Sequence, residues 1–138
     1  SSRAHSSGAK QMSSQPLPHN SKQLPPLNGI IVIDLTRILS GPHCTRILCD
    51  LGARIIKIEP PGGDPTRSFA SRISNPTSND VSSSYFASVN AGKETITLNL
   101  KESPYDRKVL TSLIQKADVL VENFRPGVIQ RLGMCSLT

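Results

Sequence analysis

Five cationic residues stand in or beside the predicted loops and strand ends of this 138-residue sequence. Arginine and lysine at such places bind phosphate or carboxylate groups through charge-assisted hydrogen bonds. If the five converge, they form a phosphate-binding rim; taken singly, each is more often an ordinary solvated cation. The five residues are Arg67, Lys93, Lys101, Arg125 and Arg131.

A predicted helix start at residues 40–43 is a second feature that favours anions, because helix N-termini present free backbone N–H groups. His43 in this segment could act as a general base, although such a histidine more often faces solvent. Cys44 lies on the apolar stripe of the same helix, so we predict a core position for it. Asp34 and Glu59 stand in predicted strands, where a buried structural carboxylate is the more common role.

Several familiar catalytic and nucleotide-binding motifs are absent from the sequence. The loop after the first predicted strand carries one glycine, Gly41, instead of the GxGxxG of NAD- and FAD-binding folds. The Walker A loop, HExxH and GxSxG do not occur either. The residues by themselves therefore indicate an α/β domain suited to a phosphorylated ligand, and go no further.

The first half of the folded region reads as strand, helix, strand. Residues 30–35 and 54–59 are short β-branched runs, typical of strands that are buried on both faces. Between them Cys44, Ile47, Leu48 and Leu51 have the spacing of one helical stripe. This order predicts a right-handed βαβ unit, whose ligand would sit at the carboxyl ends of the strands, at residues 36–42 and 60–67.

The second half repeats the pattern after an irregular stretch. Residues 68–84 are rich in Ser, Asn and Thr, so we predict a surface loop with little secondary structure. Residues 95–100 alternate like a half-buried strand, and Ser103 and Pro104 begin a predicted helix. A strand at 118–124 and a short helix at 128–132 complete an α/β fold with Rossmann-like βαβ units and a mainly parallel sheet.

Composition limits the class of protein further. The length fits one domain, and the formal charge of +6 without clustered Lys or Arg favours a small anionic ligand over nucleic acid. Three cysteines without a CxxC pair predict neither a disulfide framework nor a zinc site. We expect a reducing compartment, mitochondrial matrix or cytoplasm. No apolar run approaches the roughly 18 residues of a membrane span, so we expect a soluble protein.

Residues 1–26 form a segment of different composition, rich in Ser, Pro, Gln and Lys. Few large apolar residues are available to offset the entropy of ordering, so we predict a disordered tail. The segment lacks acidic residues and loosely resembles a mitochondrial transit segment; a plain flexible tail or a cloning remnant is the alternative.

Three blocks of sequence carry a family resemblance. Residues 26–67 (PLNGIIVIDLTRILSGPHCTRILCDLGARIIKIEPPGGDPTR), 84–101 (SYFASVNAGKETITLNLK) and 117–134 (ADVLVENFRPGVIQRLGM) together resemble the N-terminal part of the family III CoA-transferases, the CaiB/BaiF-like family. Formyl-CoA:oxalate and succinyl-CoA:dicarboxylate CoA-transferases belong to it. The related α-methylacyl-CoA racemases share the first block and match the other two less well, so a racemase-like relative is the alternative.

The resemblance implies a site for coenzyme A in residues 27–138, which we expect to be the N-terminal part of a longer family III domain. It also implies acyl-CoA and small carboxylate substrates, no metal, and a homodimer of the full-length parent. Carried over position by position, the residues implied to line the CoA are Leu39, Ser40, Leu98, Lys101, Asn123, Phe124, Arg125 and Arg131.

The chemistry implied by the resemblance is covalent. An aspartate attacks the acyl-CoA thioester to give a mixed anhydride, CoA thiolate then forms an aspartyl-CoA thioester, and the acceptor carboxylate takes over the CoA. That aspartate lies beyond the VENFRPG block in the family, so we expect it downstream of Thr138. We therefore expect this chain to be inactive alone; a non-catalytic CoA-binding fragment is the further alternative.

Overall fold

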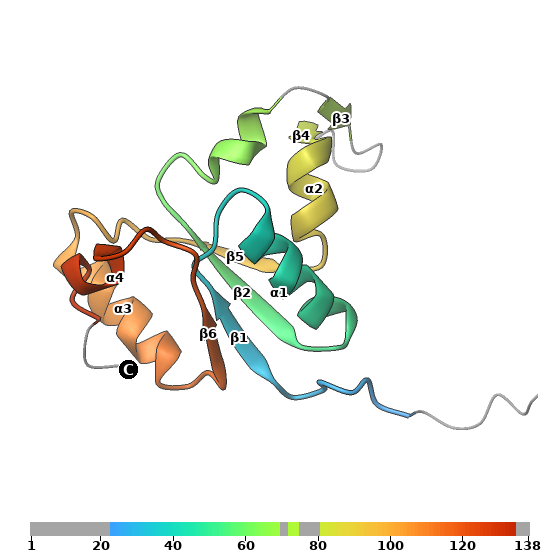
Figure 1. Cartoon of the computed structure of the whole chain (residues 1–138), viewed down its shortest axis with the longest axis horizontal. Coiled ribbons are helices and arrows are strands. Elements are labelled where there is room, and N and C mark those ends of the chain that lie inside the picture. Colours follow the sequence, from blue (N-terminus) through green and yellow to red (C-terminus); the bar gives the residue numbers. More distant parts are fainter. Residues whose placement is uncertain (1–22, 70–71, 75–80, 135–138) are drawn as a thin grey trace, which may run out of the picture.

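The computed structural model describes residues 23–69, 72–74 and 81–134 (Figure 1). The predicted disordered tail at residues 1–26 lies almost wholly outside these ranges. None of the helices in the described ranges is long and apolar enough to cross a membrane.

A four-stranded parallel sheet forms the centre of the fold. Its strands lie in the order β5 (Glu94–Thr97), β2 (Arg54–Glu59), β1 (Ile31–Asp34) and β6 (Val119–Val121). The predicted α/β class and the parallel βαβ order are thus confirmed. The observed β6 is shorter than the predicted strand at 118–124.

Helices cover both faces of this sheet (Figure 1). Successive strand residues point to opposite faces, so Val32 and Ile55 pack under α1 (Ser40–Asp50), while Ile33 and Ile56 pack under α3 (Pro104–Ile114). The short helix α4 (Val128–Arg131) lies on the α3 side, where Ile129 and Leu132 join the same core cluster.

The start of α3 follows its sequence signals closely. The Ser103 hydroxyl accepts a hydrogen bond from the Asp106 N–H at 3.1 Å, and Pro104 occupies the first helical position, as predicted. The predicted apolar stripe, including Val109, Leu113 and Ala117, packs into the core. Local capping chemistry and apolar spacing therefore suffice to place this helix.

Helix α1 is rotated relative to its predicted apolar stripe. Cys44, predicted to lie in the core, is exposed, as are Ile47 and Leu51. The buried positions are instead Gly41, Pro42 and Thr45. These residues let the helix start approach β1 closely, because a Cβ at Gly41 would lie 2.4 Å from the Thr36 Cβ. Small and polar residues hold the start of this helix against β1, whereas Leu48 of the predicted stripe does pack against the core, beside Val32 and Ile55.

The segment after β2 is more ordered than predicted. We expected an irregular loop at residues 68–84, but β3 (Arg72–Ser74) and β4 (Val81–Ser83) form a two-stranded antiparallel sheet. A 3₁₀ turn, η1 (Pro65–Ser68), precedes it and α2 (Ser84–Asn90) follows. Strands of three mostly polar residues are too short to show an alternating apolar pattern in the sequence. The prediction of an irregular loop was wrong here for that reason.

Candidate functional site

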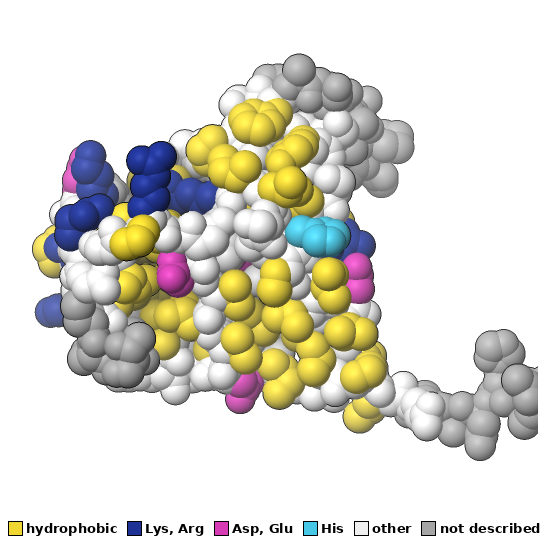
Figure 2. Space-filling view, in the orientation of Figure 1, with side chains coloured by type: hydrophobic (Ala, Val, Ile, Leu, Met, Phe, Trp, Pro, Cys, Tyr) yellow, Lys and Arg dark blue, Asp and Glu magenta, His cyan; other side chains and the backbone are white. Residues whose placement is uncertain are grey.

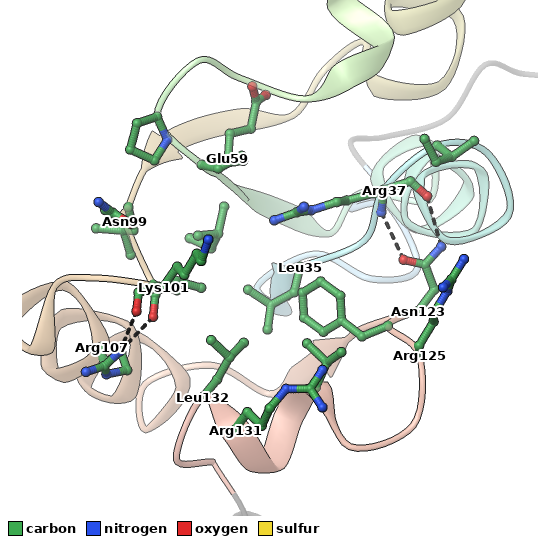
Figure 3. A pocket seen from close by; sticks show the side chains of 18 of the residues that line it. Leu35, Arg37, Glu59, Asn99, Lys101, Arg107, Asn123, Arg125, Arg131 and Leu132 are labelled. Atoms are coloured by element: carbon green, nitrogen blue, oxygen red, sulfur yellow. Dashed lines mark hydrogen bonds between the residues drawn. The ribbon is translucent and has the colours of Figure 1, made fainter.

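An open cleft of about 1200 Å³ lies where the parallel strands end (Figure 3). Its walls are the β1–α1 loop, the end of β2, the β5–α3 connection and the β6–α4 segment. The helices that follow β1 and β6 pack on opposite faces of the sheet, so these neighbouring strands form the topological switch point at which α/β folds bind ligands. The predicted edge of the sheet is therefore hollowed.

Cationic side chains gather around this cleft. Figure 2 shows Lys and Arg concentrated on the side of the molecule formed by α3 and α4. Among the lining residues, five are cations and two, Glu59 and Glu102, are carboxylates. Arg107 is partly committed, because its Nη1 donates to the carbonyls of Leu100 and Lys101. The lining cations are Arg37, Lys101, Arg107, Arg125 and Arg131.

All eight residues that the family resemblance implies to line the CoA lie along this one cleft. They come from three segments that are far apart along the chain, the β1–α1 loop, the β5–α3 connection and the β6–α4 segment, and the fold brings them together (Figure 3). Their binding of CoA stays a prediction. The residues are Leu39, Ser40, Leu98, Lys101, Asn123, Phe124, Arg125 and Arg131.

Two members of the predicted cationic rim lie elsewhere. Arg67 forms a two-pronged ion pair with Glu59, with both N–O distances at 2.7 Å, and its guanidinium lies 3.8 Å from the centre of the Phe86 ring. Lys93 is completely buried on Asp34. Neither lines the cleft, so the predicted convergence is right for Lys101, Arg125 and Arg131 and wrong for these two.

Arg37 and Arg107 belong to the cleft but were missed from the sequence. Arg37 stands in the segment 36–42 that the sequence had marked as a strand end, so its position was a usable signal. Its Cζ lies 5.7 Å from the centre of the Phe124 ring, within cation–π range. His43 is exposed and is not among the lining residues, which fits the solvent-facing alternative.

Buried polar groups hold the β1–α1 loop behind the cleft. As predicted, Asp34 and Glu59 are buried carboxylates. Asp34 accepts hydrogen bonds from the Thr36 N–H at 2.8 Å and the Thr45 hydroxyl at 2.6 Å. Its third partner is the Lys93 ammonium at 3.0 Å, which also donates to the Pro42 carbonyl. Burial lowers the pKa of Lys93, and the attraction of Asp34 opposes that effect.

A second buried ion pair lies beside the first. The Lys57 ammonium donates to the Thr36 carbonyl at 2.8 Å and stands 3.1 Å from Asp64 Oδ2, off the hydrogen-bonding direction. Burial alone would raise the pKa of Asp64. Hydrogen bonds from the Thr66 N–H and hydroxyl, together with the charge of Lys57, outweigh burial and hold that pKa below its ordinary value of 3.8.

The lowered pKa of Asp64 predicts a pH-dependent stability. The carboxyl favours the folded state fully above about pH 4, and this contribution is lost as the pH falls through the lower folded-state pKa. We expect Asp64→Asn to flatten the pH dependence of the free energy of unfolding below about pH 4, measured by urea denaturation. Asp50→Asn, at an exposed carboxylate on α1, is the control. Identical slopes for Asp64→Asn and the parent chain would contradict this prediction.

Comparison with known proteins identifies the family. The model of CoA-transferase family III matches residues 27–137. The chain belongs to CoA-transferase family III. This family III chain is 54% identical over 109 residues to the acetyl-CoA:oxalate CoA-transferase of Acetobacter aceti, covering 78% of the chain and 26% of that relative. It is 48% identical over 108 residues to a formyl-CoA:oxalate CoA-transferase of Rhodopseudomonas palustris, covering 78% of the chain and 24% of that relative.

The fold agrees with the family assignment. A crystal structure of a CaiB/BaiF family protein from Brucella suis superposes with a TM-score of 0.75 at 39% identity, covering 81% of this family III chain and 29% of that protein. The chain spans about a quarter of the length of the curated relatives it matches. The parallel sheet described here therefore corresponds to one part of the fold of that CaiB/BaiF family protein.

No aspartate in the described ranges of this family III chain lines the cleft. Asp34 and Asp64 are held in the buried ion pairs, and Asp118 accepts a hydrogen bond from the Ile31 N–H at the opposite edge of the sheet. These three aspartates therefore have structural partners outside the cleft.

Proposed function

We propose that this chain supplies much of the CoA site of a CoA-transferase that moves CoA between a succinyl-CoA-like acyl donor and a carboxylic or dicarboxylic acid. The observation that carries the proposal is the convergence of eight residues, named from the family resemblance, in one cationic cleft at the strand ends. Membership of CoA-transferase family III supports it.

The chemistry of the cleft suits coenzyme A. CoA combines phosphate groups, an adenine ring and a long pantetheine arm, so its site needs cations beside apolar surface. Lys101, Arg125 and Arg131 would meet phosphate oxygens, and the half-buried Phe124 ring offers a flat apolar face. No side chain caps the first turn of α1, Pro42 has no N–H and the His43 N–H donates to the Leu39 carbonyl, so the N–H groups of Ser40 and Gly41 are the ones available to an anion.

The reaction would need a nucleophile from outside the described residues. We propose that the aspartate which forms the covalent intermediate lies downstream of Thr138 in a longer parent, and that the parent is a homodimer. A mitochondrial or cytoplasmic location is a prediction from the sequence alone.

Calorimetric titration with CoA tests this proposal. We expect saturable binding of one CoA per chain, together with no detectable succinyl-CoA:dicarboxylate exchange by the chain on its own. The absence of saturable binding would contradict the proposed CoA site. Exchange by this chain alone would contradict the proposed location of the nucleophile.

A further inference from the structure

The β1–α1 loop forms one wall of the cleft, and its backbone is under strain at one residue. Lys57 Nζ holds the Thr36 carbonyl before the loop, and Lys93 Nζ holds the Pro42 carbonyl after it. Between them Ile38 has a φ of 72°, in the left-handed region that β-branched residues avoid. Such a conformation persists only where neighbouring contacts determine it.

The side chain of Asn123 provides those contacts. Its Oδ1 accepts a hydrogen bond from the Arg37 N–H at 2.9 Å, and its Nδ2 donates to the Arg37 carbonyl at 2.9 Å (Figure 3). The Leu35 N–H, two residues earlier, donates to the Val121 carbonyl at 2.9 Å. The amide therefore continues the β1–β6 ladder by one rung after the strands themselves have ended.

These two hydrogen bonds from the Asn123 side chain, called the Asn123 clamp below, hold the backbone of Arg37 and leave its side chain free to enter the cleft. Figure 3 shows the Arg37 side chain extending across the cleft while Asn123 engages the backbone behind it. Within the described part of the chain, no carboxylate lies within ion-pairing distance of Arg37. An exposed guanidinium that lines a cleft and has no carboxylate partner there is suited to an anionic group of a ligand.

We propose that Asn123 is a positioning residue, which holds the β1–α1 loop so that Arg37 meets an anionic oxygen of the acyl-CoA. Both polar ends of the Asn123 amide bond to the Arg37 backbone, so we expect the main effect of Asn123 on the ligand to pass through Arg37. This inference rests on the proposed CoA site. It assigns to Arg37 a binding role that the sequence did not reveal.

A double-mutant cycle with CoA as the probe separates positioning from direct contact. We expect Asn123→Ala to weaken CoA binding on the order of tenfold in the parent chain, and less than about twofold in an Arg37→Met background. An equal loss in both backgrounds would mean that Asn123 contacts CoA by itself and would overturn the proposal. Repeating the Arg37→Met titration with succinyl-CoA locates the anion: an equal loss places it on CoA, and a larger loss places it on the acyl carboxylate.

Hydrogen exchange provides a readout that needs no ligand. In Asn123→Ala we expect the Arg37 amide to exchange on the order of tenfold faster, while the sheet amides of Ile33 and Ile56 keep their protection. Asn99→Ala is the matched control, because Asn99 also lines the cleft but bonds to Glu102, and it should leave Arg37 unchanged. Unchanged exchange at Arg37 in Asn123→Ala would overturn the clamp even if CoA binds. If the parent chain bound no CoA, the proposed function would be contradicted. The exchange rate of the Arg37 amide would still test the Asn123 clamp, because that measurement needs no ligand.

Discussion

Asp34→Ala is expected to destabilise the fold by about 3–5 kcal/mol, because it leaves the buried ammonium of Lys93 without its charge partner. The substitution also removes the acceptor of the Thr36 N–H and the Thr45 hydroxyl, both of which are buried. We therefore expect the urea concentration at half-unfolding to fall strongly, or the purified variant to be unfolded already without urea. Asp34→Asn keeps the shape of the side chain and gives a graded measure of the lost charge.

Two controls test the physical cause of this effect. Asp50→Ala removes an exposed carboxylate paired with Arg46 on α1 and should cost about 0.5 kcal/mol or less. Asp34→Ala combined with Lys93→Met leaves no unpaired charge and should recover part of the lost stability. Stability of Asp34→Ala within about 1 kcal/mol of the parent chain would contradict the role assigned to this pair.

The second large effect is expected on ligand affinity. Lys101→Met combined with Arg131→Met removes two cations of the cleft and should weaken CoA binding on the order of 100-fold, since each charge-assisted hydrogen bond is worth about tenfold or more. The difference between parent and variant should shrink in 1 M salt, where screening acts over about 3 Å. Calorimetry at low and high salt measures both effects.

The matched control carries the same change in net charge outside the cleft. Lys108→Met combined with Lys116→Met removes two exposed lysines of the α3 region that do not line the cleft. We expect a change of less than about twofold. If both double variants lost affinity equally, CoA would be responding to overall charge, and the assignment of Lys101 and Arg131 to its site would fall.

Much of the fold could be predicted because its signals are local. The β-branched runs of β1 and β2, the Ser103 cap and the apolar stripe of α3 each depend on residues close together in sequence. Parallel strands with right-handed crossovers then bring their carboxyl ends to one edge. For this reason the ligand-binding edge of the sheet could be predicted from the sequence.

What could not be predicted depends on contacts between distant residues. The roles of Arg67 and Lys93 follow from carboxylates that lie near them only in the folded chain, at Glu59 and Asp34. The orientation of α1 follows from the hydrogen bond between Thr45 and Asp34, which places a polar residue where an apolar stripe would face the sheet.

The central proposal for this protein is that coenzyme A binds at the edge of the sheet where β1, β2, β5 and β6 end. The most direct measurement is a titration of the isotopically labelled chain with CoA, followed by backbone amide chemical shifts. We expect the largest shifts to fall on Ser40, Lys101, Asn123 and Arg131 and to saturate together. Saturable shifts confined to the outer faces of α1 or α3, with these four amides unchanged, would contradict it.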